Sequence, residues 1–260
     1  MSQGRSRTRR DFISLAATGV ATAALTSSRA GGARASAGIK AIAFDGFTII
    51  DARPVAARAE ELFPGQGKAL VQAWRAQQFS YAWLRTMGDR YRDFWRVTED
   101  ALDAAARAQG LALDAERRAR LMRSYLELKA WPDAVPVLRH LTDAGIKLVF
   151  LSNFTAAMLD AAVKNSGLDG VFEDHLSTDL VQAYKPDPRA YAMAPRSFGL
   201  TREEIAFVAF AGWDVAGAKW FGYPTYWANR AGAPRDTLGA TADAEGTDLS
   251  GLEAFVGLRT

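Results

Sequence analysis

The feature that most constrains the fold is a change of hydrophobic pattern along the chain. From about residue 132 to residue 229, short apolar runs alternate with segments whose apolar residues recur every three or four positions. Such alternation is typical of a parallel sheet covered by helices. The expected strands are residues 39–44, 146–153, 174–178, 204–213 and 224–229, and no strand is expected after residue 229. The expected helices are residues 134–145, 155–168, 187–200 with a break near Pro195, and one that begins at residue 214.

A long helical segment separates the first strand from the rest of the chain. Between residues 55 and 131, apolar and aromatic residues recur at helical spacing, few residues are β-branched, and the pattern breaks at "GLAL". This insert is 77 residues long, within the range of a small domain. We therefore predict an α/β protein with a doubly wound parallel sheet built from residues 38–54 and 132–260, and a helical domain inserted at residues 55–131.

The first 37 residues are predicted to be an export signal. Arg9 and Arg10 precede a mildly apolar stretch at residues 15–25, and "ASA" at residues 35–37 offers a small-residue cleavage site. This order indicates twin-arginine export and a periplasmic mature protein. The alternative interpretation is a disordered basic tail.

Composition and charge exclude several classes of function. Residues 1–37 carry six arginines and one aspartate, so their removal changes the formal net charge from +3 to −2 and leaves no support for nucleic-acid binding. Because there is no cysteine, disulfides, thiolate metal sites and a cysteine nucleophile are excluded. Two histidines argue against a histidine-rich metal site. No apolar run is long enough for an ordinary membrane-spanning helix, so no membrane anchor is expected after signal cleavage.

Polar residues follow the expected strands, where open parallel sheets bind their ligands. They are Asp45 after the first strand, Ser152 and Asn153 after the second, Lys185 in "YKPDPRAY", and Asp214 in "GWD". One aspartate at a strand end is weak evidence, because it also serves as a turn residue or helix cap. The whole set in this order is a much stronger indication of an active site.

This set, with "FDGFTIID", "WRAQQFSYAWL" and "LSNF", resembles the haloacid dehalogenase superfamily, most closely its type II (S)-2-haloacid dehalogenases. The resemblance covers essentially all of the mature chain. It implies a Rossmann-like core with a helical cap inserted after the first strand. It further implies hydrolysis of small 2-haloacids to 2-hydroxy acids through an aspartyl ester, without metal or cofactor. Dimerisation through the cap is an expectation of the same kind.

The resemblance also implies a role for each matching residue. Asp45 would be the nucleophile, Thr48 would hydrogen-bond it, and Arg75 would stabilise the departing halide. The substrate carboxylate would be held at Ser152 and Asn153. Lys185 would neutralise and orient Asp45, while Asp214 would position Lys185 and help to activate water. The residues expected around the substrate are Phe47, Phe79, Phe94, Tyr191 and Trp213, although aromatic residues at helical spacing more often belong to a plain core.

Two absent carboxylates argue against a phosphatase. Phosphatases of this superfamily carry an acid two residues after the nucleophile, where this chain has Phe47. A halide leaves without a proton, so a dehalogenase needs no such acid. Magnesium-binding relatives also carry a carboxylate near the last motif, and Asp214 is followed by Val215, Ala216, Gly217 and Ala218.

The chain departs from the family pattern in two places. The first motif lacks a glycine between Phe47 and Thr48, which shortens the loop by one residue. The last motif, usually "SSNAWD", reads "AFAGWD", so that Ala209 and Ala211 replace a serine and an asparagine. Two alternatives therefore remain: another hydrolase of the superfamily, including a phosphatase, and a carboxylate-binding protein without turnover.

Overall fold

The computed structural model describes residues 38–258, so the predicted export signal lies outside the described residues. Its centre is a six-stranded, fully parallel sheet with the order β5-β4-β1-β6-β7-β8. The strands are β1 (Ala41–Phe44), β4 (Lys147–Ser152), β5 (Leu176–Ser177), β6 (Ile205–Ala209), β7 (Thr225–Ala228) and β8 (Ala244–Gly246). The predicted α/β class with a parallel sheet is confirmed.

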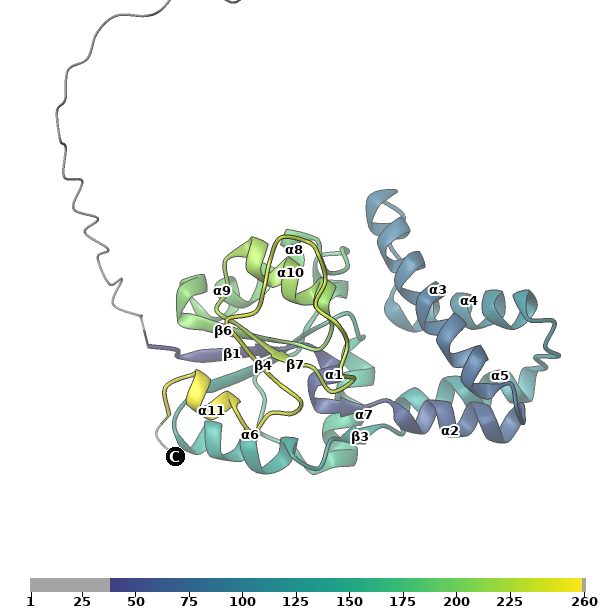
Figure 1. Cartoon of the computed structure of the whole chain (residues 1–260), viewed down its shortest axis with the longest axis horizontal. Helices are drawn as coiled ribbons and strands as arrows, with labels where there is room; N and C mark the ends of the chain where they lie inside the picture. The colour runs from purple at the N-terminus through teal and green to yellow at the C-terminus, as the bar shows by residue number, and fades with distance from the viewer. Residues whose placement is uncertain (1–37, 259–260) are drawn as a thin grey trace, which may run out of the picture. The chain divides into compact units, whose positions relative to one another are not determined.

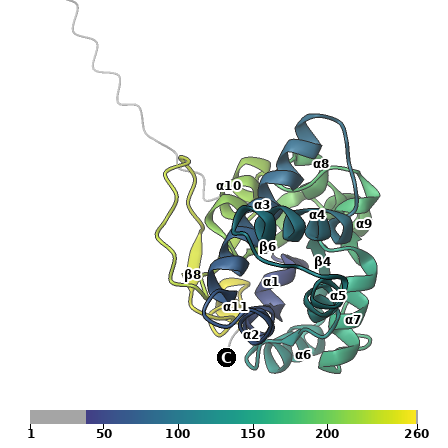
Figure 2. The same ribbon diagram turned by 90° about the vertical axis from the view of Figure 1, so that its right-hand side faces the viewer.

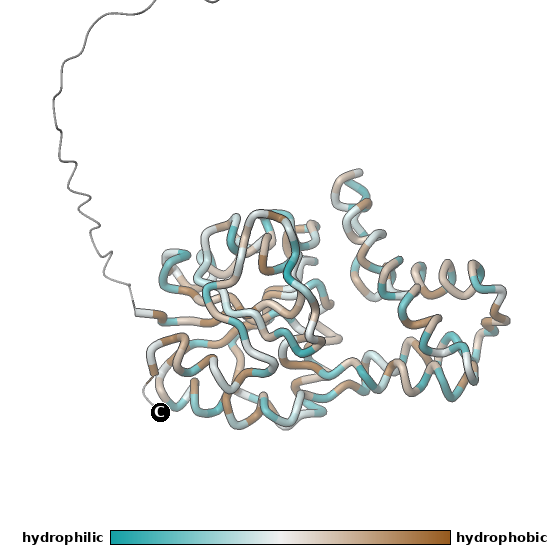
Figure 3. The backbone as a smooth tube through the Cα atoms, viewed as in Figure 1, coloured by the Kyte–Doolittle hydropathy of each residue, from teal (hydrophilic) through white to brown (hydrophobic). Residues whose placement is uncertain are grey.

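Helices cover both faces of this sheet (Figure 1). Ile42 and Phe44 of β1 pack in one core, with α6 (Ala134–Asp143), α7 (Ala156–Ser166) and α11 (Leu252–Phe255). Ala41 and Ala43 pack in the other, with α8 (Pro188–Tyr191), α9 (Met193–Phe198) and α10 (Gly212–Phe221). Because successive side chains point to opposite faces, a strand buried on both sides must be apolar throughout. This explains the continuous apolar run, which appears among the brown segments of Figure 3.

The chain leaves the sheet after β1 to form a group of helices, which we call the cap (Figure 2). Its elements are α2 (Arg53–Leu62), α3 (Gly67–Met87), α4 (Phe94–Ala108), α5 (Ala115–Arg123) and the short 3₁₀ helix η1 (Ser124–Leu126). Asp93 and Asp114 cap α4 and α5 by accepting bonds from the amides of Arg96 and Arg117. The two connections to the core pair as a small antiparallel sheet, β2 (Ile50–Asp51) with β3 (Lys129–Ala130).

Several local expectations are corrected by the structure. The helix at 188–198 breaks at Ala192, and Pro195 lies in the first turn of α9, where its missing N–H is not needed. β7 is not the final strand, because β8 pairs with its outer edge. Helix α10 begins at Gly212, with Ala211 as N-cap, so Asp214 lies inside the first turn and is not the N-cap.

Candidate active site

The candidate site lies at the carboxyl edge of the parallel sheet. Asp45 directly follows β1, and Ser152 and Asn153 lie at the end of β4. Asp214 lies in the first turn of α10, after β6, and Lys185 precedes α8. Because parallel strands end at the same edge, residues far apart in sequence meet there.

Lys185 lies between two carboxylates. Its Nζ donates to Asp45 Oδ1 at 2.7 Å and to Asp214 Oδ2 at 2.6 Å, and its side chain is 0% exposed. Burial alone lowers the pKa of a lysine, but here the two carboxylates outweigh burial and hold the pKa of Lys185 above its ordinary value. Lys185 is therefore an ammonium ion, and each of its carboxylate partners is held at a fixed position.

Asp214 is the more deeply buried of the two acids. Burial raises its pKa to about 6, although the Lys185 ammonium pulls in the opposite direction. The Tyr191 hydroxyl donates to Asp214 Oδ1 at 2.6 Å, which also favours the ionised form. Burial beside this carboxylate raises the pKa of Tyr191 well above its usual value, so Tyr191 stays protonated and acts as the donor.

Gly217 leaves the space that Tyr191 occupies. A Cβ at position 217 would lie 2.3 Å from the Tyr191 hydroxyl oxygen and 2.9 Å from Pro186 Cβ. Neither neighbour is the free end of a flexible chain, so a larger residue would push the tyrosine away from Asp214. The glycine in "DVAGA" therefore permits the hydrogen bond to Asp214.

Asp45 is both a member of this network and the N-cap of α1 (Gly46–Ile49). Its Oδ2 accepts the Phe47 N–H at 2.9 Å, while Oδ1 binds Lys185. The Thr48 hydroxyl donates to the main-chain carbonyl of Asp45 at 2.6 Å rather than to the carboxylate. Thr48 thus fixes the backbone of Asp45, and the carboxylate is oriented by Phe47 and Lys185.

Ser152 and Asn153 lie beside Asp45, at the end of the strand that pairs with β1. Ser152 Oγ accepts the Phe154 N–H at 3.1 Å, and Asn153 Oδ1 accepts the Lys185 N–H at 3.1 Å. Within residues 38–258, the Asn153 amide nitrogen makes no hydrogen bond, which leaves it free to donate to a ligand. A Cβ at Gly46 would lie 2.8 Å from Ser152 Oγ, so this glycine allows the two segments to approach.

Arg75 reaches the site from α3 of the cap. Its Cζ lies 5.3 Å from the ring centroid of Phe47, two residues from Asp45, and its side chain is half-buried. Among the described residues, no carboxylate forms an ion pair with Arg75. A partly desolvated guanidinium without a partner can bind an anion strongly, so this position suits a halide or a carboxylate.

Two groups of aromatic rings surround these polar residues. The Phe47 ring lies 4.9 Å from Phe154 and 5.7 Å from Phe210, measured between centroids. Phe79 and Trp83 of α3 lie 5.4 and 5.6 Å from Trp213 of α10. The Trp83 indole N–H also donates to the Lys185 carbonyl at 3.1 Å. The second group therefore joins the cap to the core directly above Lys185.

Some aromatic positions differ from the expectation or were missed. Phe94 is fully buried against Phe154 and Tyr184, so it packs beneath the site. Trp83 and Phe210 were not among the site residues predicted from the sequence. Phe210 stands at the second serine of the motif written "SSNAWD", and that exchange of a serine for an aromatic residue was the available signal.

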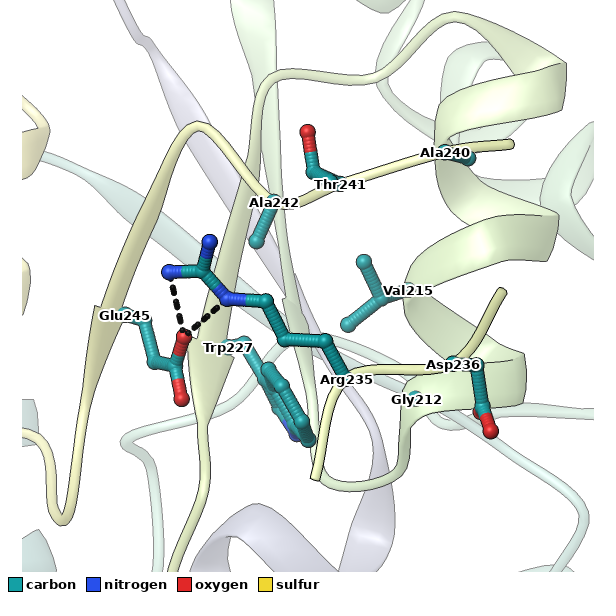
Figure 4. Close-up of a pocket in the computed structure, with 9 residues that line it drawn as sticks. All are labelled: Gly212, Val215, Trp227, Arg235, Asp236, Ala240, Thr241, Ala242 and Glu245. Carbon is teal, nitrogen blue, oxygen red and sulfur yellow. Dashed lines mark hydrogen bonds and ion pairs between the residues drawn. The ribbon is translucent and has the colours of Figure 1, made fainter. Parts of the chain in front are cut away.

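A small hollow between α10, β7 and residues 235–245 contains none of the site residues described above (Figure 4). Its volume is about 20 Å³, and Trp227, Arg235 and Glu245 line part of it. That volume admits about one water molecule. Arg235 is paired with Glu245, as the dashed lines in Figure 4 show. In residues 38–258, no group of three or more aspartate, glutamate or histidine side chains is arranged to hold a metal ion.

These features define an α/β core with a buried carboxylate–lysine–carboxylate cluster at the edge of its sheet and a helical cap, and comparison with known proteins gives the family. The haloacid dehalogenase-like hydrolase family matches residues 19–222. The chain is 43% identical over 212 residues to an (S)-2-haloacid dehalogenase of Pseudomonas sp. (strain YL), covering 81% of this chain and 91% of that protein. The chain belongs to the haloacid dehalogenase-like hydrolase family.

Solved structures agree with this assignment. A crystal structure of an L-2-haloacid dehalogenase superimposes with a TM-score of 0.82 at 45% identity, covering 84% of this chain and 99% of that one. The Xanthobacter autotrophicus L-2-haloacid dehalogenase with chloropropionic acid covalently bound gives a TM-score of 0.77 at 33% identity, covering 85% of this chain and 100% of that one. The match extends over both the core and the cap.

Proposed function

We propose that the protein hydrolyses the carbon–halogen bond of small 2-haloacids, such as haloacetates and 2-halopropionates, to give 2-hydroxy acids. The observation that carries the proposal is the geometry around Asp45. Its carboxylate is paired with the buried Lys185, and Arg75 offers an unpaired positive charge close by. The proposed nucleophile and the anion-binding group thus contact the same residue, because Asp45 accepts the Phe47 N–H and Arg75 lies over the Phe47 ring.

In the first step, an Asp45 oxygen attacks the α-carbon from the side opposite the halogen. The new carbon–oxygen bond forms an ester as the halide leaves with the bonding electrons, and the configuration at that carbon inverts. Arg75 stabilises the charge that develops on the halide. The Asn153 amide and the neighbouring backbone N–H groups hold the substrate carboxylate, so that the α-carbon faces Asp45.

In the second step, water attacks the carbonyl carbon of the ester. Asp214, whose pKa burial raises to about 6, takes a proton from that water. The bond between the Asp45 carbonyl carbon and the substrate oxygen then breaks, and the departing oxygen takes up a proton. The products are the 2-hydroxy acid, halide and a proton, and the oxygen added to the substrate comes from Asp45.

The environment of Phe47 weighs against phosphate-ester hydrolysis. Its ring occupies the position of the phosphatase acid and packs on Phe154, Phe210 and Arg75. No proton donor is therefore present there for an alcohol leaving group. The side chains of Ala209 and Ala211 offer no hydrogen bonds, but both carboxylate oxygens of Asp214 still have a donor, one from Tyr191 and one from Lys185.

The activity is tested by incubating the mature protein with 2-haloacids and phosphate esters, and measuring halide and phosphate. We expect halide release that EDTA does not change and that Asp45→Asn abolishes. Phosphate release that requires magnesium would favour a phosphatase instead. Tight binding of 2-haloacids without halide release would identify a carboxylate-binding protein.

We further propose that residues 1–37 direct twin-arginine export to the periplasm. Arg9 and Arg10 followed by an apolar stretch support this proposal. Replacing both by lysine should leave the precursor in the cytoplasm, as fractionation would reveal; export that persists would contradict it. Among the described residues, no helix is sufficiently long and apolar to cross a membrane.

We also propose that the protein forms a dimer through the cap. Leu84 and Met87, near the end of α3, are 57% and 76% exposed. Large apolar side chains that are exposed together favour contact with another protein surface. Sedimentation should give a dimer for the wild type and a monomer for the Leu84→Glu, Met87→Glu double variant; a monomeric wild type would refute this.

A further inference from the structure

The one-turn helix that follows the nucleophile is held at its carboxyl end by residues from distant parts of the core. The last four carbonyls of a helix have no partner within it. In α1 all four are nevertheless bonded. The Gly46 carbonyl accepts the Ile50 N–H, and the Ile49 carbonyl accepts the Trp131 N–H at 2.8 Å. Side chains bind the remaining two, those of Phe47 and Thr48.

Arg230, just after β7, binds the Thr48 carbonyl. Its Nε and Nη2 donate to that oxygen at 3.1 and 2.8 Å, and its Nη1 and Nη2 donate to the two Asp133 oxygens at 2.9 and 2.8 Å. The Arg230 side chain is only 6% exposed. A buried guanidinium with its donors directed at a carboxylate and a carbonyl is fixed in orientation. A positive charge is also favourable at the carboxyl end of a helix.

Trp131 binds the adjoining carbonyl. Its indole N–H donates to the Phe47 oxygen at 3.1 Å, and the Arg230 guanidinium stacks 4.7 Å from its ring centroid. Trp131 directly follows β3, the strand by which the chain returns from the cap. One residue therefore contacts the helix of the nucleophile, the arginine that supports it, and the connection to the cap.

We propose that Arg230 and Trp131 are positioning residues that set the orientation of the Asp45 carboxylate through α1. The amide of Phe47 orients Asp45 Oδ2, and both neighbouring carbonyls of α1 are held by these two side chains. The first motif is one residue shorter than is usual in the family, so less backbone separates Asp45 from these anchors. The catalytic part of this proposal rests on the proposed nucleophilic role of Asp45.

The kinetic test compares Arg230→Gln, Arg230→Lys and Trp131→Phe with the wild type. Trp131→Phe keeps an aromatic ring and removes the indole N–H. We expect kcat for halide release to fall about 10- to 100-fold, because a small displacement of a nucleophile has that effect. KM should stay within about twofold, since substrate binding is not the step affected. Arg230→Lys should recover part of the loss, because it keeps the charge.

The matched control is Arg53→Lys. The Arg53 guanidinium also lies over the Trp131 ring, at 4.5 Å, but it binds Asp51 and no carbonyl of α1. Its substitution should leave kcat unchanged. Equal decreases of kcat in Arg53→Lys and Arg230→Lys would overturn the proposal. They would show that only the stacking of a guanidinium on the Trp131 ring matters, and not the bond to the Thr48 carbonyl.

A second measurement does not depend on turnover. Hydrogen exchange of the Phe47 amide, followed by NMR, should be faster by about tenfold or more in Trp131→Phe and Arg230→Gln, because the bond to Asp45 is loosened. Folded variants with wild-type kcat and unchanged protection of this amide would overturn the proposal. If the wild type released no halide, the proposed function would fail, and amide exchange would then decide the positioning role alone.

Discussion

At the scale of single residues, the chemistry depends on how three charges share a buried space. One ammonium, Lys185, faces the carboxylates of Asp45 and Asp214. Removing one partner of such a group leaves a buried charge uncompensated, which is strongly destabilising. Variants that keep all three charges and change only a neighbouring hydrogen bond are therefore the informative ones.

Tyr191→Phe is such a variant. The tyrosine hydroxyl favours the ionised form of Asp214, so its loss should raise the pKa of Asp214 further above its ordinary value. Because Asp214 acts in its ionised form, activity should rise with pH through that pKa. We expect the acidic limb of kcat against pH, near pH 6 in the wild type, to move to higher pH in the variant.

The measurement is halide release between pH 4 and pH 9 for both proteins. An unchanged limb, or a limb at lower pH, would contradict the assignment of the limb to Asp214. Tyr223→Phe is a suitable control, because its hydroxyl donates to the Tyr191 carbonyl and not to either carboxylate.

Arg75→Lys tests the anion-binding group. A lysine keeps the charge but lacks the planar fork and the broad face that lies on Phe47. We expect kcat for halide release to fall by about 10²-fold, the usual effect of losing a group that stabilises developing charge. Arg85→Lys, on the same helix but paired with Asp100, should retain full activity. Equal activity of both variants would exclude Arg75 from the site.

At the scale of elements, α10 supplies both Asp214 and the space for its partner. Gly217→Ala would place a Cβ 2.3 Å from the Tyr191 hydroxyl oxygen. We expect the tyrosine to be displaced, giving the same shift of the acidic limb as Tyr191→Phe, together with a lower melting temperature. Trp220→Ala, at an exposed position of α10, should change neither. A variant with a normal pH profile would show that Tyr191 does not depend on Gly217.

The strands that could be predicted are those whose burial requires a recognisable hydrophobic pattern in the sequence. β1, β4 and β6 are buried on both faces, so their apolar runs identify them. β8 reads "AEG" and is partly exposed at the sheet edge, so neither alternation nor an apolar run marks it. Asp51 pairs with Lys129 across the small antiparallel sheet, a contact that local sequence does not encode.

At the scale of the whole molecule, the sequence was a good guide to which residues lie close together. It was a poorer guide to which of their atoms form hydrogen bonds. Asp45 and Lys185, 140 positions apart, could be placed together because both follow parallel strands. The bond of Trp83 to the Lys185 carbonyl depends on the docking of the cap, and the bond of Thr48 to the Asp45 carbonyl depends on the backbone at the start of α1. The contact of Arg230 with α1 could not be predicted, because it is made to the backbone carbonyl of Thr48, which any residue at that position would offer.

The central claim is that Asp45 forms an ester with the substrate, and one isotope experiment tests it directly. Excess enzyme is allowed a single turnover of 2-chloropropionate in H₂¹⁸O, and mass spectrometry then locates the label. We expect ¹⁸O to enter the side chain of Asp45, and the 2-hydroxy acid to carry unlabelled oxygen taken from that side chain. Label in the 2-hydroxy acid, with Asp45 unlabelled, would mean that water attacks the α-carbon itself and would contradict the account.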